Sequence, residues 1–211
     1  MTQNNKAALK ILLECMIVKP EESVLIVTDT ICESIGRNLF ETSLGLGFET
    51  AIIMMKPRSR SGEEPPMFIA QAMLGADVVI CPTKYSLTHT IARKNASKNN
   101  ARIATMPGIN EQVFFHGPID IDYERCKETA IKYASLLSKT TKAYVINHGK
   151  TMTLDLSGRI GKADTGIYGK SGEYGNLPAG EAYIAPLEGK ASGGIVIDGV
   201  LVIQRWALPK I

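Results

Sequence analysis

The sequence lacks the short motifs by which many enzymes are recognised. No GxGxxG follows the first expected strand, where the chain reads Thr28-Asp29-Thr30, and no GxxxxGK[ST] occurs anywhere. The dinucleotide-binding fingerprint and the P-loop are therefore both absent. A GxSxG elbow is missing as well, which removes the usual signature of a serine hydrolase.

Cysteine is scarce, and its four copies lie far apart. No two of them form a CxxC pair, the spacing typical of redox and zinc sites, and each lies inside an apolar run: Cys15, Cys32, Cys81 and Cys126. We therefore expect buried thiols in a reducing compartment. No apolar run approaches the roughly 20 residues of a membrane span, and the N-terminus lacks the basic-then-apolar order of a signal peptide. The expected location is the cytoplasm, with no membrane partner.

A strong charge of one sign is also missing. The net charge is only +3, and the 24 Lys and Arg residues are scattered rather than gathered in one stripe, which argues against nucleic acid as a partner. With 45% hydrophobic and 21% charged residues, the 211-residue chain has the composition of an ordinary globular protein. Its length suits one large domain, or one domain and a smaller second one.

The first part of the chain alternates between strand-like and helix-like segments. Continuous apolar runs, which are typical of parallel strands covered on both faces, alternate with segments whose apolar residues recur at helical spacing. We expect strands at 23–28, 50–55, 77–81 and 102–105, and helices ending before Lys19, around 35–44, and at 65–74, 88–99 and 121–138. The pattern predicts an α/β domain, residues 1–140, with an open parallel Rossmann- or flavodoxin-like sheet.

After residue 140 the pattern changes to short strands separated by Gly-rich turns. We expect strands at 142–147, 151–156, 181–185, 194–197 and 200–203, with no helix among them. This predicts a smaller β-rich domain over residues 141–211. About 70 residues of β-structure make a marginal core with uncovered sheet edges. We therefore expect either a homo-oligomer or the incomplete start of a larger catalytic domain.

Three polar residues near the ends of the expected parallel strands are candidates for ligand contact. Asp29 follows the first strand, where open sheets bind ligands, although such a residue also favours capping the next helix. His89 and Arg93 follow the third strand four residues apart. On one helical face they could bind an anionic group of a substrate; the alternative is a first-turn histidine capped by Thr88.

Glu181 follows the polar turn formed by residues 175–180 and begins a short apolar strand. Carboxylate oxygens are ligands of divalent cations such as Zn, Mn, Co or Mg. One carboxylate alone is not a metal site, however, and a residue at the start of a strand can equally be exposed or pair with a nearby lysine. The spacing alone favours this structural alternative.

The residues around Glu181 nevertheless resemble a known signature. GNLPAGEAYIAPLEG at 175–189, followed by SGGIVIDG at 192–199, is similar to the Asn-Leu-Pro-x-Gly-Glu signature of the thermophilic metallo-aminopeptidases, the leucyl aminopeptidases of the aminopeptidase T and PepS type. SLTHTIAR at 86–93 and RIATMPG at 102–108 also resemble the N-terminal domain of that family. The resemblance extends over nearly the whole chain.

This resemblance implies a two-metal aminopeptidase that removes N-terminal residues from small peptides. The family holds two divalent ions (Zn, Co, Mn or Mg) with the signature glutamate, a second glutamate, two histidines and an aspartate, and Glu181 matches the first of these. His89 and Arg93 would line the substrate cleft. After Glu181 the only acids are Glu188 and Asp198, and no histidine follows. The other ligands are therefore expected from outside this chain, which alone is not expected to be active.

Two other functions stay open at this point. The chain could be a non-catalytic binding or oligomerising domain whose sheet edges pair across a two-fold axis. The family also distantly resembles ring-opening dioxygenases of dihydroxypyridines, which use a single iron.

Overall fold

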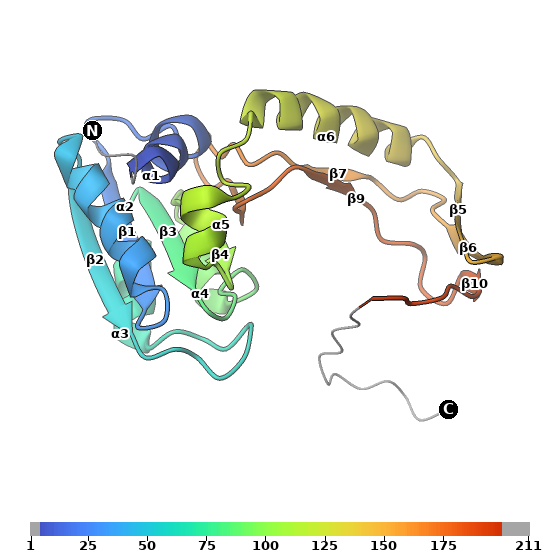
Figure 1. Cartoon of the computed structure of the whole chain (residues 1–211), viewed down its shortest axis with the longest axis horizontal. Coiled ribbons are helices and arrows are strands. Elements are labelled where there is room, and N and C mark those ends of the chain that lie inside the picture. The colour runs from blue at the N-terminus through green and yellow to red at the C-terminus, as the bar shows by residue number, and fades with distance from the viewer. Residues whose placement is uncertain (1–4, 200–211) are drawn as a thin grey trace. The chain divides into compact units, whose positions relative to one another are not determined.

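Five parallel strands form the main sheet of the computed structural model, which describes residues 5–199 (Figure 1). Their order is β2-β1-β3-β4-β8: Glu49–Met55, Ser23–Asp29, Val78–Thr83, Arg102–Pro107 and Tyr174–Asn176. Because β2 lies on one side of β1 and β3 on the other, the sheet has the flavodoxin-like arrangement. The predicted α/β class with an open parallel sheet is confirmed.

The helices cover the sheet on both faces, and the alternation of side chains along β1 shows how. On one face Val24 and Ile26 pack in a core with residues of α1 (Lys6–Lys10), η2 (Ile11–Cys15), α2 (Glu33–Gly45) and α5 (Glu111–His116). On the other face Leu25 and Val27 pack with α3 (Met67–Leu74) and α4 (Ile91–Lys98). Successive side chains of a strand point to opposite faces, so two helical layers explain why β1 reads as one continuous apolar run.

Several helix limits differ from the expected ones. The first helix continues into a π-helical turn, in which Met16 N–H donates to Ile11 O at 2.8 Å. The helix expected at 88–99 begins only at Ile91, because the Thr90 side chain accepts a hydrogen bond from Arg93 N–H and so acts as its N-cap. The short α5 was not expected at all, although Asn110 caps it in the same way through Val113 N–H.

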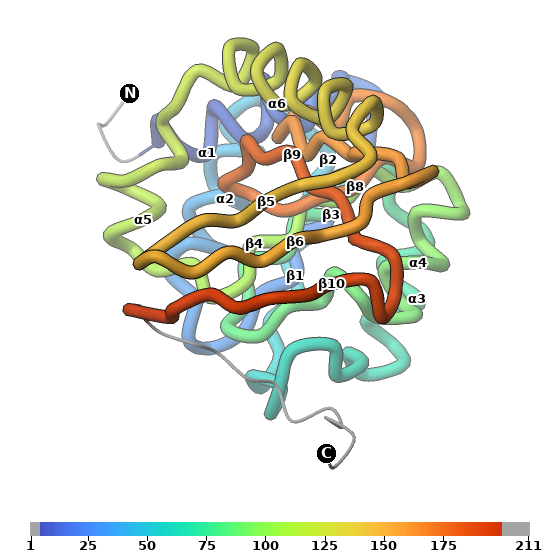
Figure 2. Tube along the Cα trace, turned by 90° about the vertical axis from the view of Figure 1, so that its right-hand side faces the viewer, coloured from blue at the N-terminus to red at the C-terminus, as the bar shows by residue number. Residues whose placement is uncertain are grey.

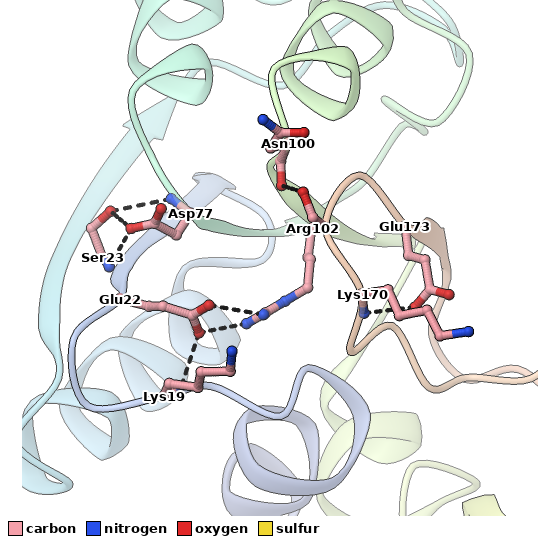
Figure 3. Close-up of polar contacts among 9 residues, drawn as sticks. Lys19, Glu22, Ser23, Asp77, Asn100, Arg102, Lys170 and Glu173 are labelled. Carbon is pink, nitrogen blue, oxygen red and sulfur yellow. Dashed lines mark hydrogen bonds and ion pairs between the residues drawn. The ribbon is translucent and has the colours of Figure 1, made fainter.

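Polar contacts join the amino ends of the strands (Figure 3). Arg102, at the start of β4, donates from Nη1 and Nη2 to the two carboxylate oxygens of Glu22, at 2.9 and 2.7 Å. Ser23, at the start of β1, donates from N and Oγ to Asp77 Oδ2, at 2.9 and 2.8 Å. These contacts link β1 to β4 and to the segment that precedes β3.

The chain divides into two compact units that interleave along the sequence. The first comprises Met1–Lys132 and Ala163–Ala182, and the second comprises Tyr133–Lys162 and Tyr183–Ile211. Two elements run from one unit into the other: the helix α6 (Tyr123–Ser138) and the two-stranded sheet of β7 (Lys162–Asp164) and β9 (Glu181–Tyr183). Within residues 5–199, no helix is both long and apolar enough to cross a membrane.

The second unit contains a three-stranded antiparallel sheet in the order β10-β6-β5, whose strands lie side by side in Figure 2. The strands are Ala191–Gly193, Lys150–Asp155 and Lys142–Asn147. β5 and β6 are joined by a two-residue turn, His148-Gly149, in which both residues have positive φ, 45° and 69°. Such turns match the twist of a hairpin.

The strand expected at 194–197 is wrong. Residues 191–193 form β10 instead, and at Val196 the Asn147 side chain accepts from the backbone N–H and donates to the carbonyl, at 3.1 and 2.7 Å. The side-chain amide of Asn147 thus makes the two backbone hydrogen bonds with Val196 that a neighbouring strand would otherwise make. The strand expected at 200–203 lies outside the described residues.

Candidate functional site

The turn before Glu181 leaves the main sheet at the carboxyl end of β8. This strand runs parallel to β4, with Tyr174 opposite Ile103 and Asn176 opposite Thr105. The Leu177–Pro178 peptide is cis, and Leu177 is 2% exposed. Glu181 then begins β9. The buried Leu177 anchors the turn, so the position of Glu181 follows from the edge of the parallel sheet.

Asn176 is held at both its side chain and its backbone. Its Oδ1 accepts hydrogen bonds from the hydroxyls of Thr105 and Thr88, at 2.7 and 2.9 Å. Its carbonyl accepts from the hydroxyl of Tyr168, at 2.7 Å. These partners come from β4, from the segment before α4 and from the loop before β8, so three separate stretches of the first unit converge on one residue of β8.

Tyr168 fills the space beside Gly175. Burial and the nearby Asp164 carboxylate raise the pKa of Tyr168 above its ordinary value, so its hydroxyl keeps its one proton, for which Asp164 Oδ1 and the Asn176 carbonyl are both within hydrogen-bond distance. A Cβ atom on Gly175 would lie 2.2 Å from that hydroxyl oxygen. Only glycine therefore fits in β8 at this position. Gly180 has a φ of 131°, a backbone conformation that residues with a side chain rarely adopt.

Glu181 is exposed, and its carboxylate makes no hydrogen bond or ion pair with another residue of 5–199. It is therefore not clamped by a lysine. Among these residues, however, no three His, Cys, Asp or Glu side chains come together in a group that could hold a metal ion. One isolated carboxylate does not fit a two-metal centre, so the described residues do not build such a centre by themselves.

His89 and Arg93 do not share a helical face, because His89 precedes the N-cap of α4. His89 is exposed, whereas Arg93 is 4% exposed. The Arg93 Nε donates to the carbonyl of Thr88 at 2.6 Å, and the guanidinium lies 3.7 Å from the centre of the Tyr174 ring. A cation stacked on an aromatic ring in this way binds α4 to β8. Substrate contact by His89 and Arg93 stays a prediction.

Asp29 is fully buried at the end of β1, and its carboxylate is satisfied by backbone amides. Oδ1 accepts from Ile31 N–H and Cys32 N–H at 3.0 and 3.1 Å, and Oδ2 accepts from Lys84 N–H at 2.7 Å. α2 begins only at Glu33, after Cys32 in the N-cap position. Asp29 therefore organises the turn before the helix and joins it to the end of β3, rather than capping the helix.

The cysteines of the buried core do not have reactive thiols. Cys15, Cys32 and Cys81 are buried, Cys126 is partly exposed, and all four are free. Burial raises the pKa of the Cys15, Cys32 and Cys81 thiols to about 12. A thiol that stays protonated is a poor nucleophile, so these three residues contribute packing.

Sequence reasoning singled out Glu181 as a candidate but missed the residues that hold its turn. Thr88 and Thr105 lie far from Asn176 in the sequence, and no periodicity connects them or the nearer Tyr168 with it. The available signal was chemical: an Asn directly before an apolar Leu-Pro pair needs partners for its amide if the turn is buried.

Comparison with known proteins agrees with this architecture. No family model and no curated protein sequence matches the chain. Among solved structures, the chain is similar to 2,5-dihydroxypyridine dioxygenase from Pseudomonas putida KT2440, with a TM-score of 0.73 and 13% identity over 90% of this chain. It is also similar to wild-type AmpT from Thermus thermophilus, with a TM-score of 0.61 and 14% identity over 90% of this chain. The match covers 58% of the first protein and 63% of the second. At these identities the similarity establishes the α/β fold.

Proposed function

We propose that this chain belongs to a metal-dependent aminopeptidase that removes N-terminal residues from small peptides, with Glu181 as one of its metal ligands. The observation that carries the proposal is the state of Glu181, an exposed carboxylate without a partner among the described residues. It follows a turn that is anchored by Asn176 and Leu177. The fold similarity to AmpT supports the same reading.

The proposal requires ligands beyond those that residues 5–199 bring together. Residues 182–211 contain no histidine, and no metal-binding group of three side chains occurs within 5–199. The remaining ligands would come from further sequence or from another subunit. The test therefore uses the full-length protein in its native assembly.

The first prediction concerns Glu181→Gln in that protein. We expect the variant to lose bound divalent metal and at least about 100-fold in turnover of a leucyl p-nitroanilide, because an amide is a much weaker ligand than a carboxylate. Metal content is measured by plasma mass spectrometry. Glu128→Gln, which changes an exposed glutamate of α6, is the matched control. Unchanged metal content and turnover in Glu181→Gln would overturn the assignment.

A second candidate is favoured by one observation: the similarity to the dihydroxypyridine dioxygenase has the higher TM-score, 0.73 against 0.61. In this reading the protein would bind a single iron and open a dihydroxypyridine ring. Iron in the metal analysis, together with oxygen uptake on adding 2,5-dihydroxypyridine, would favour this candidate over the peptidase.

A non-catalytic, oligomerising role is supported by β5. Tyr144 and Ile146 of this strand are 61% and 72% exposed, and β5 lies at the edge of its three-stranded sheet. An exposed apolar edge strand is suited to pair with a second copy. Sedimentation of a stable monomer without bound metal would speak against both the oligomer and the peptidase.

A further inference from the structure

A cavity of about 400 Å³ lies in the second unit, between two short stretches of chain. One wall consists of residues 158–160 and Lys162, and the other consists of residues 183–185. The first wall carries two cations, Arg159 and Lys162. The apolar part is formed by Ile160, Tyr183 and Ile184. Nothing in the proposed peptidase or dioxygenase chemistry uses this cavity.

The two cations of the wall are incompletely satisfied. The Arg159 Nε–H group is buried and has no hydrogen-bond partner among the described residues. A buried donor without an acceptor is rare and unfavourable. Lys162 is exposed and forms no ion pair with any residue of 5–199. The cavity wall therefore carries an excess of positive charge, because Lys162 has no charged partner among these residues and Arg159 is paired only at its Nη2.

An ion pair within the chain shows that the Arg159 guanidinium can bind a carboxylate. Arg159 Nη2 forms an ion pair with Glu188, whose side chain is 86% exposed. Such an exposed side chain is held weakly, because water solvates it almost as well as the guanidinium does. Glu188 therefore occupies one edge of the guanidinium as an internal, displaceable carboxylate.

Both walls are fixed before any ligand arrives. Arg159 N–H donates to the carbonyl of the buried Leu156 at 3.0 Å. Gly161 N–H donates to Ser138 Oγ at 2.9 Å, and a Cβ atom on Gly161 would lie 2.4 Å from Ala134 O, so the turn is packed closely against α6. The opposite stretch is anchored where Leu187 N–H donates to Asp155 O, at 2.8 Å. A cavity with fixed walls loses little entropy when it binds a ligand.

We propose that this cavity binds the carboxylate of a small amphipathic acid, with the carboxylate on Arg159 and Lys162 and an apolar side chain against Ile160 and Ile184. The planar guanidinium matches a carboxylate through two parallel hydrogen bonds. The C-terminal end of a short peptide carries this chemistry, but the site does not depend on the proposed peptidase activity.

The test measures binding of N-acetyl-L-leucine by isothermal titration calorimetry, with N-acetyl-L-leucinamide as the neutral counterpart. Both probes lack a free amine and a scissile N-terminal residue, so the result is independent of hydrolysis. We expect the acid to bind at least about tenfold more tightly than the amide, because only the acid forms charge-assisted hydrogen bonds.

Four variants locate the site. Arg159→Gln is expected to weaken binding of the acid about tenfold and Lys162→Gln about threefold, whereas Glu188→Gln is expected to strengthen it by removing the competing carboxylate. Lys150→Gln removes an equal charge from an exposed position of β6 and is expected to have no effect. Because Lys162 is exposed, its variant tests the site even if Arg159→Gln unfolds.

Three results would overturn the proposal. One is the absence of saturable binding of the acid by the wild-type protein. Another is equal binding of the acid and the amide. The third is wild-type affinity in a folded Lys162→Gln variant together with no gain in Glu188→Gln.

Discussion

At the scale of single residues, the most consequential pair is Glu22 with Arg102. Their side chains are only 15% and 5% exposed, and two parallel hydrogen bonds join them. Burial by itself would raise the pKa of Glu22, but the hydrogen bonds from Arg102 and from Lys19 N–H hold it below the ordinary 4.5. The folded state therefore favours the ionised carboxylate.

This pair makes a pH-dependent contribution to stability. A carboxyl group with a lowered folded pKa stabilises the protein fully above its unfolded pKa, and the contribution is lost as the pH falls through the folded pKa. We expect Glu22→Gln to lower the free energy of unfolding by about 2 kcal/mol at pH 7, and by much less near pH 3. Urea unfolding at both pH values measures this. Equal destabilisation at pH 7 and pH 3 would contradict the argument, and Glu128→Gln serves as the exposed control.

The residue scale also shows what the sequence could and could not reveal about the site. The signature that singles out Glu181 could be recognised because its residues are consecutive in the sequence. Arg93 is buried against Tyr174, a partner supplied by a strand that follows much later in the chain. Contacts between distant segments leave no periodic trace, so the fixing of Asn176 by Thr88 and Thr105 was not foreseeable.

At the scale of elements, the long apolar strands and the short β9 were predicted, whereas the short strands β7, β8 and β10 were not. β1 and β3 are apolar runs buried along their length, and such runs are typical of strands in a parallel sheet. β8 reads only Tyr-Gly-Asn, with a glycine and no β-branched residue, so its propensity for a strand is low. It forms because the edge of β4 offers a partner and because Leu177 is buried beside it.

A glycine substitution tests how β8 is held. Gly175→Ala is expected to destabilise the first unit by about 2 kcal/mol, because the new methyl group would overlap the hydroxyl of Tyr168. Hydrogen exchange should show faster exchange at Leu177 N–H and Ile103 N–H, which bond across the β4–β8 edge. Gly45→Ala, where no atom lies within 4 Å of the added Cβ, is expected to be neutral. Similar effects of the two substitutions would refute the close packing.

At the scale of the whole molecule, the segment 163–182 returns to the first unit after the chain has begun the second. A linear reading assigns neighbouring residues to one domain, so it does not foresee this return. The returning segment adds the fifth parallel strand and carries Glu181. The candidate site is thus a product of the tertiary fold.

The thiols report on the integrity of the whole fold. We expect Cys126, the partly exposed thiol, to react with Ellman's reagent in the native protein. The three buried thiols should react at least about 100-fold more slowly, because they must first be exposed by unfolding. Cys126→Ser should abolish the fast phase and leave the slow one. A second fast thiol in that variant would show that one of the buried cysteines is accessible in the native state.

The carboxylate of Asp29 has a consequence for what the parallel sheet can bind. The turn after β1 lies at the point where the order of strands reverses, which is where flavodoxin-like folds usually receive the phosphate of a cofactor. Here its amides already donate to a carboxylate that is covalently part of the chain. A phosphate arriving at this turn would find the amides of Ile31, Cys32 and Lys84 already engaged. These three N–H groups are therefore not free to bind a phosphate in the way that an open turn at this position could.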